Sequence, residues 1–309
     1  MAIFLALLAK IAPLYLIVFL GYLAGSKLNV RKESVATLLI YFIAPFVIFY
    51  GVVSATFDVS LILLPLFFFI VATTLSIVFY WIGRHFWKGA ERNLLAFTAG
   101  SGNTGYFGLP VILALFGDQY LSVAVLSTLG LILFENSVGY YFVARGEAAP
   151  RDVFLKMAKL PTIYAFAAGV AFLLMHVPIG SGFVGMLGNF KGAYSILGMM
   201  MVGLGLAGVT RAAIDAKLLT AAFTAKFLLW PSIIVGSILL DMHVFHLLSP
   251  LAYPAMLILS VVPLASNTVA FATQLNAAPE KAAVTVLAST LFALAYIPLF
   301  MTFISPLVL

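Results

Sequence analysis

Long apolar stretches separated by short polar clusters run along the whole chain. An α-helix needs about 20 predominantly apolar residues to cross the hydrocarbon core of a bilayer. With the polar clusters taken as boundaries, the pattern predicts ten membrane-spanning segments, at residues 4–25, 35–54, 59–82, 93–116, 120–143, 160–177, 192–210, 217–240, 251–275 and 280–304. We therefore predict an all-α membrane protein, with no soluble domain between the spans.

The composition supports this fold class. Hydrophobic residues make up 64% of the 309 residues and charged residues only 8%, whereas soluble domains carry about 25% charged residues. The chain has no cysteine, which excludes disulfides, thiolate metal sites and cysteine nucleophiles. The N-terminal apolar stretch has no basic leader region and is too long for a signal peptide, so we interpret it as a retained first helix.

The basic residues predict the orientation of the chain. Of the 16 lysines and arginines, 13 lie in alternate connections between the predicted spans. They are Lys27, Arg31, Lys32, Arg84, Lys88, Arg92, Arg145, Arg151, Lys156, Lys159, Arg211, Lys217 and Lys281. Positive charge marks the cytoplasmic face. We therefore expect a multi-pass protein of the cytoplasmic (inner) membrane with both termini on the outer, periplasmic side, and the charge gives no reason to expect a nucleic-acid partner.

Two halves of five spans each flank a polar insert near the middle of the chain. An odd number of spans per half places the halves in opposite orientations, the layout of inverted-repeat transporters. We predict a first repeat over 1–146, a short cytoplasmic connector over 147–159 and a second repeat over 160–309. The motif SGNT at 101–104 in the fourth span and ASNT at 265–268 in the ninth occupy equivalent spans of the two halves.

These two motifs place polar and helix-breaking residues deep within apolar spans. Gly102 and Pro110 are expected to break the fourth span, and Pro263 the ninth. Irregular backbone at this depth is tolerated only where it is buried in protein or lines a cavity, and the N-terminal ends of broken helices attract anions. The predicted substrate ligands at the two breaks are Asn103, Thr104, Gly105, Ser266, Asn267 and Thr268. The alternative is that glycine and proline are common in membrane helices and the asparagines bond between helices.

Two ionisable residues lie deep within the spans, Glu135 in the fifth and Lys226 in the eighth. Their similar depths allow an ion pair, and a charge inside a membrane span is a functional candidate. Lys226 is a candidate for attracting an anion and Glu135 for coupling transport to protons; the alternatives are a structural pair or a lysine that reaches the surface. Asn136 is a further candidate for the same cavity, and a helix–helix hydrogen bond explains it equally well.

No catalytic residue, metal site or organic cofactor is predicted. The glycine pattern at 203–208 matches a dinucleotide fingerprint but follows no strand, and small residues that let helices approach closely explain it better. His243 and His246 have no evident third ligand. The expected partners are the lipid bilayer, a small organic anion and a coupling ion, either H+ or Na+.

Several stretches resemble one family of transporters. GNTGYFGLPVILALFGD at 102–118 is similar to the fourth-helix signature of the auxin efflux carrier family, whose bacterial members include malonate and malate carriers. FLGYLAGSKLNV (19–30), LPTIYAFAAGVAF (160–172) and VGLGLAG (202–208) resemble its first, sixth and seventh helices. The stretch Ser266–Thr268 after Pro263 departs from the second crossover pattern of the plant carriers, which puts auxin itself in doubt as substrate.

This resemblance carries implications for architecture and mechanism. It implies ten helices in two inverted five-helix repeats with broken, crossing helices four and nine, as in the bile acid, arsenite and riboflavin transporter superfamily and in sodium–proton antiporters. It further implies a scaffold domain and a crossover transport domain drawn from both repeats, elevator-type movement of organic anions, and a homodimer.

The function predicted from the sequence is secondary transport of small organic anions, such as auxin-like, malonate-like or malate-like carboxylates, by alternating access. One alternative is a sodium-coupled organic-anion symporter of the same fold. A more distant alternative is an intramembrane transferase, which would need an acid pair or a metal cluster where the spans supply only Glu135.

Overall fold

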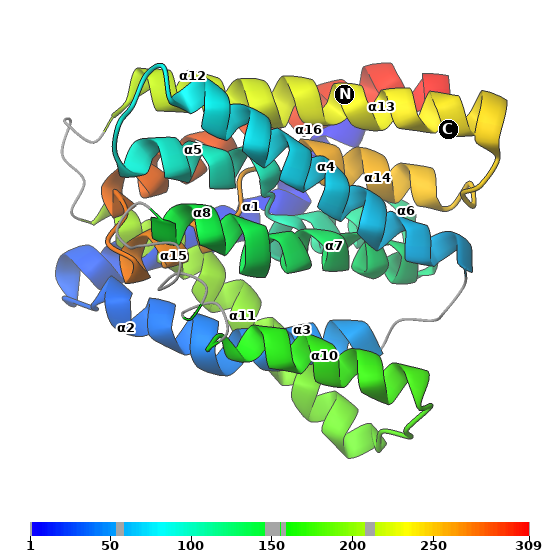
Figure 1. The fold of residues 1–309 in the computed structure, drawn as a ribbon, viewed down its shortest axis with the longest axis horizontal. Coiled ribbons are helices and arrows are strands. Elements are labelled where there is room, and N and C mark those ends of the chain that lie inside the picture. Colours follow the sequence, from blue (N-terminus) through cyan, green and yellow to red (C-terminus); the bar gives the residue numbers. More distant parts are fainter. Residues whose placement is uncertain (1, 54–58, 146–154, 156–158, 208–213, 309) are drawn as a thin grey trace.

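The computed structural model describes residues 2–53, 59–145, 155, 159–207 and 214–308. Over these residues every regular element is helical and none is a strand, so the prediction of an all-α protein is confirmed for the described part (Figure 1). Apart from residues 155 and 159, the predicted connector at 147–159 lies outside the described residues.

Helical residues coincide with each of the ten predicted segments. In the first half the α-helices are α1 (Ala2–Lys27), α2 (Lys32–Thr37), α3 (Ala44–Val53), α4 (Val59–Gly83), α5 (Ala90–Gly100), α6 (Leu109–Phe116), α7 (Leu121–Phe134) and α8 (Tyr140–Arg145). In the second half they are α10 (Pro161–Leu174), α11 (Ser181–Leu206), α12 (Ala216–Phe223), α13 (Trp230–Leu240), α14 (Ala252–Val261), α15 (Asn267–Gln274) and α16 (Pro279–Val308).

Several of these helices are joined end to end by π-helical turns, which keep the chain helical over longer stretches. These turns are η1 (Leu38–Ile43), η2 (Thr104–Gly108), η4 (Glu135–Gly139), η6 (Thr224–Leu229) and η7 (Asp241–Phe245), and a short 3-10 turn, η3 (Asp118–Tyr120), precedes α7. Within the described part of the chain, four uninterrupted helical stretches are long and apolar enough to cross a membrane: Lys32–Tyr50, Leu63–Gly83, Ala216–Phe245 and Pro279–Val308. The remaining described helices are shorter, less apolar or interrupted.

The predicted start of the seventh span, residue 192, is wrong, because α11 begins at Ser181. The added segment contains three glycines and Lys191, which lower its hydropathy and gave it the pattern of a loop. Its helical conformation does not depend on hydropathy, since the segment continues the same hydrogen-bonded ladder as the rest of α11.

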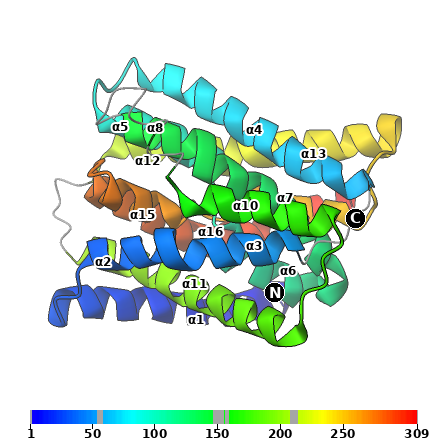
Figure 2. The same cartoon turned by 60° about the horizontal axis from the view of Figure 1, so that its bottom comes forward.

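The helices pack into two groups. Figure 1 shows α3 and α10 below α4 to α8, and Figure 2 shows α1 beside α11. In the group named here the α11 group, α1 lies along α11, and α3 packs against both α10 and α11. The α14 group contains α4 to α8 and α12 to α16, with α4 packed on α5 and α7. All ten residues of α14 are buried, which makes it the centre of the larger group.

Close packing within the α11 group depends on glycine. A Cβ atom on Gly203 of α11 would lie 1.9 Å from the Val18 carbonyl oxygen of α1, so the two backbones touch at this point. Gly21 of α1 makes the reciprocal approach to Met200. These contacts support the interpretation of the 203–208 glycines as packing residues.

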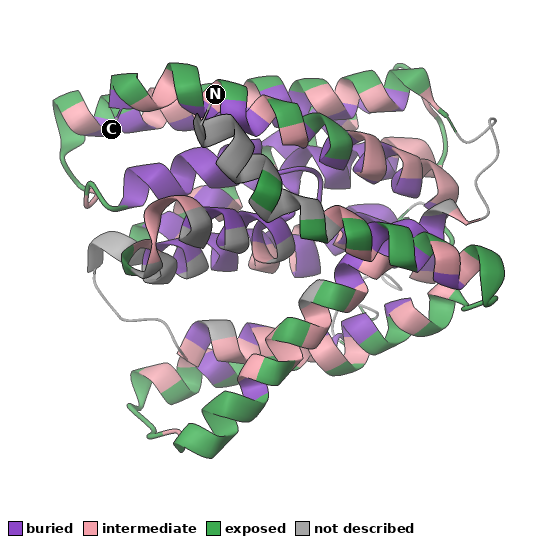
Figure 3. Cartoon of the chain, turned by 180° about the vertical axis from the view of Figure 1, so that it is seen from behind, coloured by how far each residue is buried: buried purple, intermediate pink, exposed green. Residues whose placement is uncertain are grey.

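Exposed residues lie on the outer faces of the molecule, while buried residues are concentrated between the helices (Figure 3). Many of the exposed residues are large and apolar. The exposed ones include Leu16, Phe19, Ile70 and Phe303. An apolar exterior of this extent matches a hydrocarbon environment. Together with the apolar spans, it describes a multi-pass membrane protein.

An ionic cluster lies at one end of the helices, where the loops after α1, α4 and α15 gather (Figure 1). The ammonium of Lys281 lies 2.8 Å from the Glu91 carboxylate and 3.3 Å from that of Asp215. The Trp87 indole donates to Asp215 at 3.0 Å. The cluster therefore ties together the loop before α5, the start of α12 and the start of α16.

Candidate functional site

The first helix break lies between α5 and η2. The α5 helix ends at Gly100, Ser101 is extended, and helix resumes at Thr104. Asn103 adopts φ −74° and ψ 63°, and the Thr104 N–H donates to the Gly102 carbonyl at 2.7 Å. These values describe an inverse γ-turn centred on Asn103. Gly102 therefore lies within the break that the sequence predicted.

The second break lies between α14 and α15 and follows from local chemistry. A proline disfavours helical backbone at the residue before it, and Val262 accordingly adopts φ −61° and ψ 152° before Pro263. Helix resumes at Asn267. Within the break, the Leu264 N–H donates to the Ser289 hydroxyl at 3.0 Å, which satisfies one buried backbone donor.

The two breaks are in direct contact. The Asn103 N–H donates to the Pro263 carbonyl at 2.8 Å, and the Asn103 side-chain amide donates to the Ser266 hydroxyl at 3.1 Å. The same amide lies 3.7 Å from the Met199 sulfur of α11. The tertiary structure thus brings the SGNT and ASNT motifs together, with α11 against them.

Pro110 does not interrupt the fourth span, contrary to the prediction. It is the second residue of α6, in a helix that runs without a break from Thr104 to Phe116. The preceding turn is π-helical, with the Gly108 N–H bonded to the Asn103 carbonyl at 3.0 Å. Because this turn is wider than an α-turn, it accommodates the missing proline donor without ending the helix.

Glu135 contacts both breaks from η4 and is only 3% exposed. Its carboxylate accepts a hydrogen bond from the Asn267 amide at 2.8 Å, and the Gly102 N–H also points to it. The Asn267 amide additionally pairs with the Tyr194 hydroxyl of α11, at 2.9 and 3.0 Å. A Glu135–Asn267–Tyr194 chain therefore connects η4, α15 and α11.

Lys226 approaches the first break from η6 and is completely buried. Its ammonium donates to the Leu259 carbonyl at 3.4 Å and lies 5.0 Å from the centre of the Trp230 ring. The Trp230 indole donates to the Ala99 carbonyl at 2.8 Å, near the end of α5. The alternative that Lys226 reaches the surface is therefore wrong, because it points between the helices.

Glu135 and Lys226 do not form the direct ion pair that their depths allowed. Among the described residues, Lys226 forms no salt bridge. Instead, the acid faces the Gly102 N–H, and the Lys226 nitrogen lies 2.7 Å from the position that a Cβ on Gly102 would occupy. The two charges therefore flank the break at Gly102.

Three buried oxygens at the breaks have no hydrogen-bond partner within the described part of the chain: Ser101 Oγ, Asn103 Oδ1 and Thr268 Oγ1. A Cβ atom added to Gly105 would meet nothing within 4 Å among the residues that the structure describes, so open space adjoins the first break. Buried polar atoms are normally paired, and unpaired ones next to open space are typical of a site that receives a ligand.

Of the other predicted site residues, Thr104 lies at a helix break and Asn136 does not. Thr104 is buried at the start of η2, directly after the first break. Asn136 bonds to its own helix, donating to the Ile132 carbonyl at 2.9 Å, and so has a structural contact apart from the breaks.

Sequence reasoning missed Tyr194 and Trp230. Trp230 follows Lys226 by four residues, the spacing that places two side chains on one helix face, and this signal was available. Tyr194 had no such signal, because only the packing of α11 brings its hydroxyl to Asn267.

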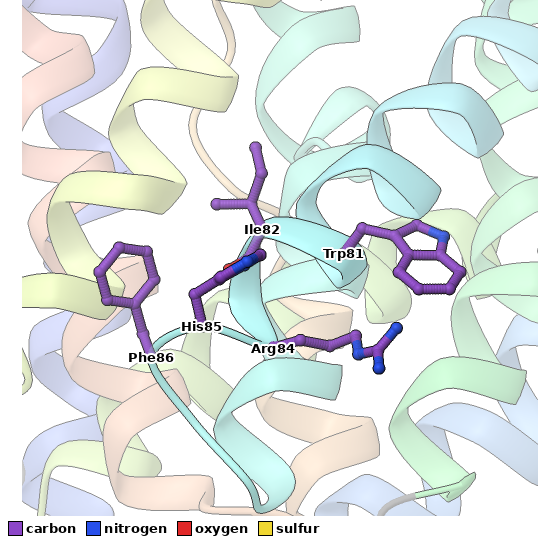
Figure 4. A pocket seen from close by; sticks show the side chains of 5 residues that line it. All are labelled: Trp81, Ile82, Arg84, His85 and Phe86. Atoms are coloured by element: carbon purple, nitrogen blue, oxygen red, sulfur yellow. The ribbon is translucent and has the colours of Figure 1, made fainter.

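A separate surface hollow of about 730 Å³ lies at the end of α4, lined by Trp81, Ile82, Arg84, His85 and Phe86 (Figure 4). The Arg84 guanidinium lies 4.5 Å from the centre of the Trp81 ring. None of its lining residues belongs to the two breaks. No group of three metal-ligating side chains occurs among the described residues.

An apolar, all-helical chain with a polar site buried at two helix interruptions belongs to the class of multi-pass membrane proteins. Residues 6–153 match the family described as "Membrane transport protein", which agrees with the resemblance carried by the motif at 102–118.

Two archaeal relatives are also transporters by name. The chain is 29% identical over 207 residues to an uncharacterized transporter of Methanocaldococcus jannaschii, a match that covers 62% of this chain and 66% of the relative. It is 28% identical over 215 residues to an uncharacterized transporter of Methanothermobacter thermautotrophicus, covering 66% of this chain and 69% of the relative. The matched region thus spans about two thirds of each relative.

Proposed function

We propose that this protein is a secondary carrier of small organic anions, which binds the carboxylate of its substrate where the two helix breaks meet. The observation that carries the proposal is the buried ammonium of Lys226, which has no carboxylate in direct contact among the described residues. A buried charge is normally paired because desolvation without a partner is costly. A substrate carboxylate beside Gly102 would supply that partner.

The remaining polar groups of the breaks suit the same ligand. The hydroxyls of Ser101 and Thr268, which have no hydrogen-bond partner among the described residues, can donate to carboxylate oxygens. Asn103, Thr104, Ser266 and Asn267 supply further amide and hydroxyl groups around the same point. Gly105 leaves room for the body of the substrate, since its Cβ position is open.

The proposed architecture has ten crossings in two inverted repeats. The interrupted stretches α5–η2–α6 and α14–α15 would be its broken fourth and ninth spans. The α11 group would form the scaffold and the α14 group the moving transport domain, in a homodimer with both termini outside the inner membrane. Contacts between the groups at Tyr194–Asn267 and Met199–Asn103 support this division, because an elevator movement would expose the site by remaking such contacts.

The test is ligand binding to purified protein. Thermal unfolding is measured against a panel of mono- and dicarboxylates, and the best stabiliser is then titrated. Asn103→Ala and Asn267→Ala should each weaken its affinity by about tenfold, the effect of losing one hydrogen bond to a charged group. The matched control Asn189→Ala changes an exposed asparagine of α11 and should leave the affinity unchanged. Equal affinity in all three variants would remove the breaks from the binding site.

A sodium-coupled symporter is the second candidate, favoured by one observation. All three buried atoms that lack a partner at the breaks are oxygens, the ligand type that hard cations prefer. Stabilisation by sodium that potassium at equal ionic strength does not reproduce would support this candidate. Equal stabilisation by both ions would count against it.

A further inference from the structure

We infer that binding of the anion is coupled to uptake of one proton by Glu135, so that the carrier moves its anion together with a proton. The inference rests on the proposed anion site at the helix breaks. It follows from the positions of Glu135 and Lys226 on either side of Gly102 and from the hydrogen bonds of Asn267, and it names the coupling ion that the proposed function leaves open.

Before a ligand binds, the buried site contains one acid, Glu135, and one base, Lys226. Lys226 from η6 faces Glu135 across the break, and Tyr194 from α11 reaches it through Asn267. With Glu135 ionised, the formal charges of this acid and this base cancel. The site is therefore neutral before a ligand arrives.

The other elements around Glu135 add no charge. The helices α7 and α15 carry no ionisable residue. In α5, Glu91 and Arg92 lie in the first turn, where Glu91 pairs with Lys281 and Arg92 stacks over Tyr80 of α4 at 4.6 Å. On its own helix, Tyr140 packs against the Phe271 ring, and Arg145 in the last turn lies over the Tyr141 ring at 5.8 Å. Lys226 is thus the one cation facing Glu135 in the described part of the chain.

Binding of an anion changes the net charge of the site. A carboxylate beside Lys226 leaves the site with a net charge of −1 while Glu135 stays ionised. Both protein groups are buried, and an uncompensated charge in such surroundings is strongly unfavourable. Transfer of one proton from water to the Glu135 carboxylate restores neutrality, and loss of that proton accompanies release of the anion.

The side-chain amide of Asn267 forms the hydrogen bond to Glu135 and can adapt to its protonation state. Its amide presents a donor on one side and an acceptor on the other. The donor now serves the ionised Glu135 carboxylate at 2.8 Å, and both sides also meet the Tyr194 hydroxyl. Rotation of this amide would present its oxygen to a protonated Glu135 and its NH₂ to the Tyr194 hydroxyl, whose oxygen can accept that hydrogen bond. Asn267 can therefore satisfy both protonation states of Glu135, one without and one with the anion.

The experiment measures protons directly. Acetate and propionate, which are both monoanions near pH 7, are each adjusted to the pH of the sample and added separately to purified protein in weakly buffered detergent solution, and a pH indicator reports uptake while binding is followed by calorimetry. About one proton should be taken up per bound anion. Glu135→Gln should still bind the anion but without proton uptake. The matched control Glu33→Gln, at an exposed surface carboxylate, should keep the uptake of the wild type.

A second measurement does not depend on whether the Glu135→Gln variant folds. In infrared difference spectra of the wild type, anion binding should produce the C=O band of a protonated carboxyl group, and Glu135→Asp should shift it. Three results would overturn the proton coupling and leave the proposed carrier function intact. They are anion binding without proton uptake or the infrared C=O band, proton uptake that persists in Glu135→Gln, and anion binding that requires sodium. Absence of binding by either carboxylate would overturn the coupling together with the proposed site.

Discussion

The ammonium nitrogen of Lys226 lies 2.7 Å from the point where a Cβ atom on Gly102 would stand. At the first break, the buried ammonium of Lys226 therefore lies directly against the backbone of Gly102, which has no side chain. A methyl group at this position would displace the end of the lysine side chain, which is flexible, and press on Val262 at 3.2 Å. The glycine is therefore required for the position of the charge more than for the fold.

We predict that Gly102→Ala folds but binds the anion about tenfold more weakly, because the displaced ammonium makes a longer contact with the carboxylate. Its unfolding free energy should change by no more than about 1 kcal/mol. Titration by calorimetry and thermal unfolding in detergent check the two parts. An unchanged affinity in Gly102→Ala would separate Lys226 from the anion.

Gly105→Ala is the companion variant. Its added methyl meets nothing within 4 Å in the described part of the chain, so folding should be unaffected. Because the methyl enters the space assigned to the substrate, larger carboxylates should lose more affinity than acetate. Equal effects on all sizes would place the substrate elsewhere.

Glycine within α11 gives a prediction about stability. Gly203→Ala should destabilise the protein by about 2 kcal/mol or more, because its methyl would overlap the α1 backbone at Val18. Gly192→Ala lies in the same helix with nothing within 4 Å and should be neutral or stabilising by about 0.5–1 kcal/mol. Thermal unfolding of both variants compares them. Equal stabilities would contradict the close contact between α1 and α11.

The hydroxyl of Tyr194 links the α11 group to Asn267. Tyr194→Phe removes that link and leaves Asn267 with Glu135 alone, so we expect the amide to be less well oriented and the anion affinity to fall by about fivefold. Tyr22→Phe, an exposed tyrosine of α1, is the control. Anion titrations decide the outcome, and an effect no larger in Tyr194→Phe than in Tyr22→Phe would exclude Tyr194 from the site.

The ionic cluster at the end of the helices predicts a pH dependence. The hydrogen bond from Lys281 lowers the pKa of Glu91. Burial by itself raises the pKa of Asp215, but hydrogen bonds from the Leu218 N–H, Trp87 and Lys281 together hold it below its usual range. A lowered pKa stabilises the fold above the ordinary carboxyl value of about 4, and this contribution is lost as pH falls through the lowered value.

Stability should therefore decline as pH falls from about 5 to about 3. Lys281→Met should be less stable than wild type at neutral pH by about 1 kcal/mol, the scale of partly exposed ion pairs, and should show a shallower decline in acid. Thermal unfolding over this pH range is the measurement. Parallel profiles for the two proteins would mean that Lys281 does not set the titration of these carboxylates.

The helical segments and the two interruptions could be predicted from the sequence because their causes are local. Apolar length fixes a span, and Pro263 forces Val262 out of the helical region whatever surrounds it. The predictions for Pro110 and for the start of α11 were wrong because the local sequence pattern does not decide these two features. A π-turn accommodates the proline, and hydropathy carries no information about a helix that continues through glycines and Lys191.

By itself, then, the sequence determined an all-helical membrane protein with polar breaks at Gly102 and Pro263 and with two charges at matching depth. Only the tertiary structure decided that Glu135 and Lys226 flank Gly102 without touching, and that Tyr194 and Trp230 join them. Depth along a helix follows from counting residues. The direction in which a side chain points between helices depends on how those helices rotate and pack against one another, which no local pattern encodes.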